Sequence, residues 1–149
     1  MKTGERSYHL RLQEFLDCYM ETDPKRELEK AAKGISGDPG GDMDELALKF
    51  LGLSVFYGAS EKAKQITLQK AKEGKILLTV DGKGKYQLPP PDAKLTDRVI
   101  SIARAITHID ADQGRLPVSM GLRNDRMDIV FSFNRKGGEE SFTISFPEL

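Results

Sequence analysis

GKILLTVDGKGKYQLPPPD, residues 74–92, decides how the middle of this chain is built. Two short strand-like runs flank the dipeptide Asp81-Gly82. An Asp-Gly pair between two such runs favours a tight turn, so the stretch predicts a β-hairpin. The lysines around the turn raise a functional question, which is whether this hairpin contacts nucleic acid or is an ordinary basic surface hairpin.

Upstream of the hairpin the chain is expected to be helical. Residues 7–21 carry apolar side chains at helical spacing, and 24–34 begins with Pro24 directly after Asp23, which is a helix start signal. The segment 44–57 is apolar on all sides, which is typical of a helix central in a core. GAS at 58–60 is expected to break that helix, and residues 61–73 to form a further, lysine-rich helix.

Downstream of the hairpin, three consecutive prolines at 89–91 predict a short stiff spacer. A stripe of aliphatic residues with helical spacing follows, and after it come three runs that alternate between apolar and polar residues. A helix packed on one apolar face of a three-stranded antiparallel meander satisfies both patterns. The helical stripe consists of Leu95, Val99, Ile102, Ile106 and Ile109.

The predicted fold class is therefore α+β. Residues 1–88 form a helical part that ends in the β-hairpin, 89–91 form the spacer, and 92–149 form an α-β-β-β unit, and the two parts are free to pack as one domain. The order of elements over about 24–88 is similar to the layout of a winged helix, in which a recognition helix precedes a hairpin wing. That likeness concerns the layout alone.

The composition is that of a globular protein in a reducing compartment. The 149 residues are 38% hydrophobic and 31% charged, the formal net charge is zero, and Cys18 is the single cysteine. The most apolar run, 46–59, carries a lysine and is shorter than the roughly 20 residues that cross a bilayer. We therefore expect a cytoplasmic protein without a membrane partner.

A local excess of lysine suggests nucleic acid as a partner. Residues 61–86 contain seven lysines and three acidic residues, a net charge of +4 in a chain that is neutral as a whole. Lysines on one surface neutralise phosphates and release counterions, and glutamines on a helix can reach base edges. The candidate nucleic-acid-binding residues are Lys62, Gln65, Gln69, Lys72, Lys83 and Lys85.

The same residues have a simpler interpretation. The expected helix over 61–73 contains no arginine, the residue best suited to bidentate contact with guanine. Lysine is also an ordinary means of keeping an exposed strand from aggregating. The leading hypothesis is a non-enzymatic binding or regulatory protein that contacts nucleic acid. The alternative is a protein–protein interaction or scaffold module that does not.

The outward face of the predicted meander offers a second surface. Its residues are small, rich in hydroxyl groups and almost uncharged, whereas a solvated sheet usually carries more lysine and glutamate. Such a face suits a dimer interface, another protein or the floor of a ligand pocket, and a water-facing sheet remains the alternative. The candidate interface residues are Ser132, Thr143 and Ser145.

Catalytic and metal sites find little support. His108, Asp110 and Asp112 are metal-ligand types, but they fall where a helix is expected to end, with no obvious fourth ligand. Cys18 and His9 lie in no recognisable activating context. We therefore expect no catalytic residue, metal or cofactor, and an enzyme whose site residues are dispersed along the chain is a further alternative.

Overall fold

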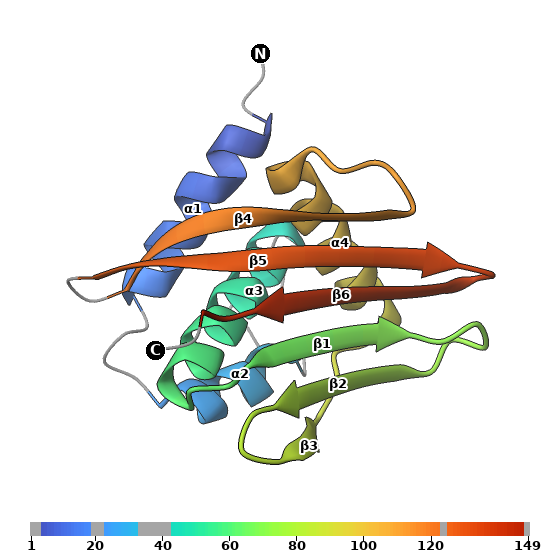
Figure 1. The fold of residues 1–149 in the computed structure, drawn as a ribbon, viewed down its shortest axis with the longest axis horizontal. Coiled ribbons are helices and arrows are strands. Elements are labelled where there is room, and N and C mark those ends of the chain that lie inside the picture. The colour runs from blue at the N-terminus through green and yellow to red at the C-terminus, as the bar shows by residue number, and fades with distance from the viewer. Residues whose placement is uncertain (1–3, 19–22, 33–42, 123–124, 148–149) are drawn as a thin grey trace.

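The computed structural model describes residues 4–18, 23–32, 43–122 and 125–147. Within these residues the chain forms four helices and one six-stranded antiparallel sheet, which confirms the α+β class (Figure 1). The helices are α1 (Gly4–Cys18), α2 (Pro24–Ala32), α3 (Met43–Ser60) and α4 (Ala93–Thr107). The strands are β1 (Gln65–Lys70), β2 (Ile76–Asp81), β3 (Lys85–Leu88), β4 (Gln113–Leu122), β5 (Asp125–Lys136) and β6 (Glu139–Ser145).

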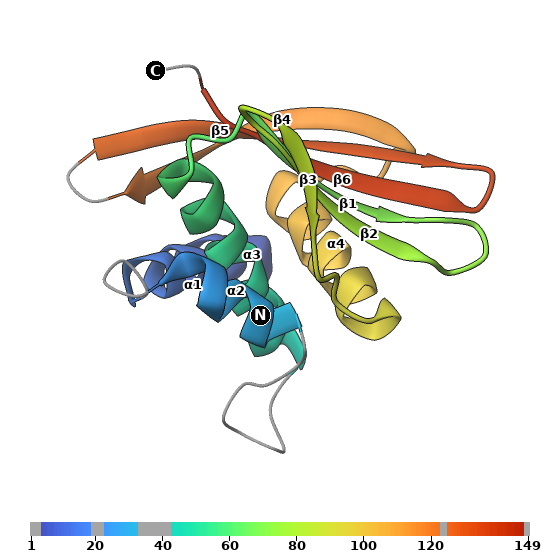
Figure 2. The same cartoon turned by 90° about the horizontal axis from the view of Figure 1, so that it is seen from below.

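The sheet joins the two halves of the chain. Its strand order is β3-β2-β1-β6-β5-β4, so β1 lies beside β6 at the centre. The four helices lie on the same side of this sheet (Figure 2). Strands from 1–88 and from 92–149 therefore share a single sheet and a single helical layer.

The prediction of a helix over 61–73 is wrong, because Gln65–Lys70, in the middle of that segment, form strand β1. Helix α3 runs on to Ser60 and ends with Lys62 in the left-handed conformation, at φ 56°. The amide of Ala63 then donates to the carbonyl of Gly58 at 2.9 Å, which closes the helix end in the manner usual when glycine follows a helix. Here a lysine holds that position, so the sequence lacked the usual signal.

Gly58 lies inside α3 and does not end it. A Cβ at this position would come within 2.2 Å of the ring of Phe146, so glycine allows the segment after β6 to pack directly on the helix. Gly58 was expected to break the helix, but its role is to allow this close packing.

The hairpin of β2 and β3 is confirmed, but it is not a free wing. Strand β2 pairs with β3 on one side and with β1 on the other. The meander of β4, β5 and β6 is also confirmed, and it continues through β6 into β1. The winged-helix layout is absent from this described part of the chain, since a strand occupies the place of the recognition helix.

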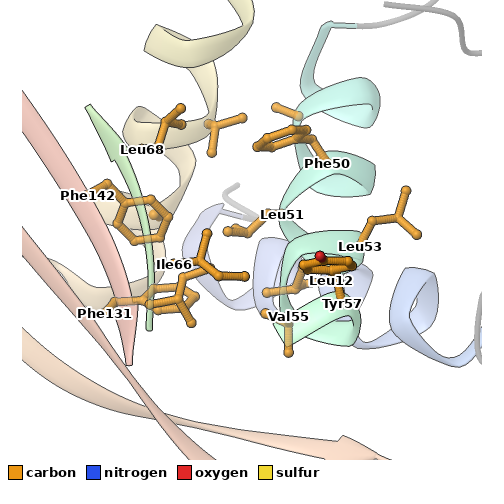
Figure 3. Packing of buried hydrophobic residues seen from close by; sticks show 14 of the residues in the cluster. Leu12, Phe50, Leu51, Leu53, Val55, Tyr57, Ile66, Leu68, Phe131 and Phe142 are labelled. Atoms are coloured by element: carbon orange, nitrogen blue, oxygen red, sulfur yellow. The ribbon is translucent and has the colours of Figure 1, made fainter. Parts of the chain in front are cut away.

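The core lies between the sheet and the helices. Ile66 and Phe142 point from the strands toward α3, and Leu51 points back from the helix (Figure 3). The ring of Phe142 meets that of Phe131 edge-on, with centroids 5.1 Å apart. An apolar void of about 10 Å³ lies beside Leu51 and Ile66, which is too small for a ligand.

Candidate interaction face

The sheet face turned away from the helices is left open by all described residues (Figure 2). Alternation along β1 buries Ile66 and Leu68 against the helices and directs Gln65, Thr67 and Gln69 outward. The same alternation turns every second residue of the other strands to this side. We call this surface the open face.

Strand register aligns the outward residues in rows that cross the sheet. The middle row places hydroxyl groups on four adjacent strands, and the Oγ1 atoms of Thr67 and Thr143 lie 3.1 Å apart. In strand order this hydroxyl row is Gln87, Thr79, Thr67, Thr143, Ser132 and Arg115.

The neighbouring rows are also mostly uncharged. Toward the turn between β1 and β2 the next row is Leu77, Gln69, Ser141, Asn134 and Gln113. On the other side the row is Lys85, Asp81, Gln65, Ser145, Val130 and Pro117. The centre of the open face is therefore neutral and is built from hydroxyl, amide and small apolar groups.

Charged side chains lie toward the rim of the open face, and two of the positive ones stand opposite negative ones. Lys85 is the register partner of Asp81 at one end of the sheet. Lys136 is the register partner of Glu139 at the other. These cross-strand pairs reduce the net field at the rim.

The three predicted interface residues lie on the open face. Ser132, Thr143 and Ser145 alternate with buried residues and point away from the helices. Gln65 and Gln69, which were assigned to nucleic-acid contact on a helix, lie on β1 of the same face. The sequence thus identified part of this surface but not its extension across β1, and the alternation of QITLQK was the available signal.

One of the four candidate lysines lies apart from the other three. Lys62 precedes β1, and Lys83 lies in the adjacent β2–β3 turn, where Gly82 packs near Ala63. Lys72 lies beyond the other end of β1, near Gly138 of the β5–β6 turn. Because β1 spans roughly 20 Å at about 3.3 Å per residue, Lys72 is separated from Lys62 and Lys83 by the length of the strand. Lys85 lies at the same end as Lys62 and Lys83, where it is the register partner of Asp81.

Lys70 faces the helical layer. Its Nζ bonds the carboxylate of Asp97 on α4 at 2.9 Å. This lysine therefore ties the sheet to a helix, although it contributed to the local charge of +4 counted from the sequence.

Both edges of the sheet are protected. The side-chain amide of Gln13 on α1 donates to the carbonyl of Gly121 at 2.9 Å and accepts from its amide at 2.8 Å, so it takes the place of a strand partner. Because hydrogen-bonding directions alternate along β4, the nitrogen of Pro117 also faces this edge, where no N–H is needed. The other edge, β3, has four residues and is followed by the three prolines.

A polar cluster ties the helices together. Tyr8 of α1 donates to Asp44 of α3 at 3.2 Å, and Arg98 of α4 forms an ion pair with the same carboxylate. The hydrogen bond from Arg98 lowers the pKa of Asp44, and burial together with the Asp44 charge raises the pKa of Tyr8. Tyr8 and Arg98 both bind the carboxylate of Asp44, so we interpret this cluster as a structural contact between the three helices.

A second polar contact holds strand β3 to α3. The hydroxyls of Tyr57 and Tyr86 lie 2.5 Å apart. Burial raises the pKa of Tyr57, and the hydrogen bond with Tyr86 adds to the effect. Tyr57 therefore stays a neutral phenol, and the pair serves to anchor the edge strand.

The His108–Asp112 segment has a structural role. His108 caps α4 in the left-handed conformation, and Arg135 of β5 forms an ion pair with Asp112 at 3.1 Å. Arg104 donates to the carbonyl of Ala111 at 2.7 Å and packs over the ring of Phe133. These contacts dock the loop, and the described residues contain no group of three potential metal ligands.

No family model and no curated protein sequence matches this chain. Among the described helices, none is long and apolar enough to cross a membrane.

Proposed function

We propose that this chain is a non-catalytic binding module that takes a partner protein on its open face. The observation that carries the proposal is the neutral centre of that face, where hydroxyl and amide groups follow one another across adjacent strands. Soluble proteins usually keep such a surface charged. A glutamine and prolines protect the edges of this sheet from pairing with other chains, but among the described residues no charged side chain at the centre of the open face keeps other proteins away.

A protein partner fits this surface better than nucleic acid does. The three rows described above contain no aromatic side chain on which a base could stack. Of the four lysines that would neutralise phosphates, Lys72 lies at the other end of β1 from the remaining three, and Lys85 stands opposite Asp81. Nucleic acid remains the rival partner, and the cytoplasm is the compartment that the single cysteine favours.

A site-specific crosslinker tests the proposal. A photoreactive amino acid replaces Ser132 on the open face, and in a matched variant it replaces Ser101, an exposed serine of α4. After irradiation in the native cells, mass spectrometry identifies what is joined to each variant. We expect a defined protein adduct from position 132 and none from position 101.

Other outcomes would contradict the proposal. Adducts from both positions with the same broad set of proteins would mean random collision, and an adduct with nucleic acid at position 132 would favour the rival. If irradiation crosslinks no protein at position 132, the open face is not a binding surface.

A further inference from the structure

We propose that the partner on the open face is a second copy of this chain, bound face to face about a two-fold axis. The inference rests on the proposed function and names its partner. In the resulting dimer the two sheets form the inside and the two helical layers form the outside.

The chemistry of the open face is self-complementary. A hydroxyl group both donates and accepts a hydrogen bond, and a carboxamide carries one acceptor and two donors. A row such as Thr79, Thr67 and Thr143 can therefore bond to its own copy without requiring a partner of different chemistry. A two-fold interface requires such self-complementarity, because the same surface patch occurs on both sides.

The charges of the chain permit this contact. The formal net charge is zero, so two copies do not repel each other as whole molecules. At the rim, the Lys85–Asp81 and Lys136–Glu139 pairs stand in register, which limits local repulsion. A neutral centre within a rim of both signs is also the common arrangement of a reversible protein interface.

The size of the open face fits a reversible dimer. Six strands at about 4.8 Å spacing give a width of roughly 24 Å, and three outward residues along a strand give roughly 20 Å. Each copy therefore contributes on the order of 500 Å², and the pair about 1,000 Å², which is near the lower limit for specific interfaces. Small side chains let the sheets approach closely, and packed sheets cross at about 30°.

Sedimentation equilibrium of the full chain over a wide concentration range measures the association. We expect a mass that rises from 16.6 kDa toward twice that value as concentration increases. The mass returns to that of the monomer on dilution, because the interface is small and polar.

Charge substitutions at the centre of the face identify the interface. Thr143 lies next to Thr67 near the middle of the sheet, so in a two-fold dimer a charge placed there lies close to its own copy. Thr143→Lys and Thr143→Glu should each raise the dissociation constant at least about tenfold, because like charges face each other. An equimolar mixture of the two variants should recover the dimer, now as a pair of opposite charges.

Ser101→Lys and Ser101→Glu are the matched controls, since they place the same charges on the outside of α4. They should dimerise as the unsubstituted chain does, separately and mixed. Circular dichroism and thermal unfolding establish that all four variants are folded. The recovery on mixing cannot come from misfolded chains.

Three results would overturn the inference. These are a monomer at every concentration, Thr143 variants that associate like the Ser101 variants, and a mixture of Thr143 variants that stays monomeric. The crosslink at position 132 separates this failure from failure of the proposed function. An adduct with a different protein would keep the open face as a binding surface and exclude the second copy.

Discussion

Strand β1 carries a different chemistry on each of its sides. Ile66 and Leu68 are about 2% exposed and belong to the core, whereas Thr67 between them is partly exposed and its hydroxyl bonds to that of Thr143 on the neighbouring strand. The residue types of the covered face are explained by folding, since burying apolar side chains there stabilises the protein. Residues on the open face do not need to be apolar for the protein to fold. The uncharged composition of that face therefore calls for a functional explanation.

The same contrast holds across the sheet. The buried side of β5 and β6 stacks the rings of Phe133 and Phe142 with centroids 5.3 Å apart. The other side of the same two strands carries Ser132 and Thr143 in register. Adjacent residues of one strand therefore serve two separate purposes, stability inward and recognition outward.

Phe131→Ala compared with Ser132→Ala tests this division most strongly. Phe131 is fully buried, so its truncation should lower the free energy of unfolding by about 3–5 kcal/mol. Ser132→Ala, one residue away on the open face, should change it by less than about 0.5 kcal/mol. Urea denaturation of both variants measures the difference, and similar losses would mean that the open face also carries folding energy.

Gly58→Ala tests how tightly the covered side is packed. The added Cβ would lie 2.2 Å from a ring carbon of Phe146, so we expect a loss of about 1–3 kcal/mol from overpacking. In a Phe146→Ala background the same change should be neutral or stabilising, because alanine favours a helix over glycine. Thermal unfolding of the two single variants and the double variant measures this coupling. Additive effects would show that Gly58 and Phe146 do not constrain each other.

Asp44→Asn contrasts a charged contact of the helical layer with the neutral contacts of the open face. The pKa of Asp44 is lower in the folded protein than in the unfolded chain, so its ionisation stabilises the fold above the unfolded pKa of about 4. That stabilisation is lost as pH falls through the folded-state pKa. We expect Asp44→Asn to cost about 1 kcal/mol at pH 7, a value reduced by the partial exposure of the ion pair.

Unfolding of Asp44→Asn and the unsubstituted chain is measured from neutral pH to pH 3. The difference in the free energy of unfolding between the two proteins should become smaller as the solution becomes acidic, because the carboxylate of Asp44 is then protonated. A gap that stays constant with pH would mean that the ion pair with Arg98 does not stabilise the fold.

Patterns with a clear period made much of the fold predictable. The aliphatic stripe of α4, the alternation in β4 to β6 and the hairpin signal at Asp81-Gly82 each specify one kind of element, and the structure has a helix, three strands and a hairpin there. The turn itself differs from the prediction, since Asp81 pairs with Lys85 and the loop is the three residues 82–84. Pro24 at a helix start and Asp23 before it were equally clear, and Asp23 caps α2 through its side chain. Local physics was sufficient for these elements.

Two features depended on contacts distant in the sequence. The helix expected at 61–73 failed because a lysine at 62 ends α3, and because β1 is fixed by partners on β2 and β6. The candidate interface residues on β5 and β6 were predicted to face away from the helix, and they do. Half of the open face, however, comes from β1, which was predicted as helix, and from β2 and β3, which were predicted as a separate hairpin. No local pattern reveals which strands become neighbours, so the full extent of the face required the structure.

The pairing of β1 with β6 has a consequence for the way this protein is made. Thr67 and Thr143 are 76 residues apart, so a ribosome completes β1 long before its neighbour exists. Until β6 is synthesised, β1 and β5 each expose an unpaired edge, and such edges recruit other chains. Folding should therefore be slow for a chain of this size and late during translation, and a nascent chain stalled before Glu139 should be the form most prone to aggregation.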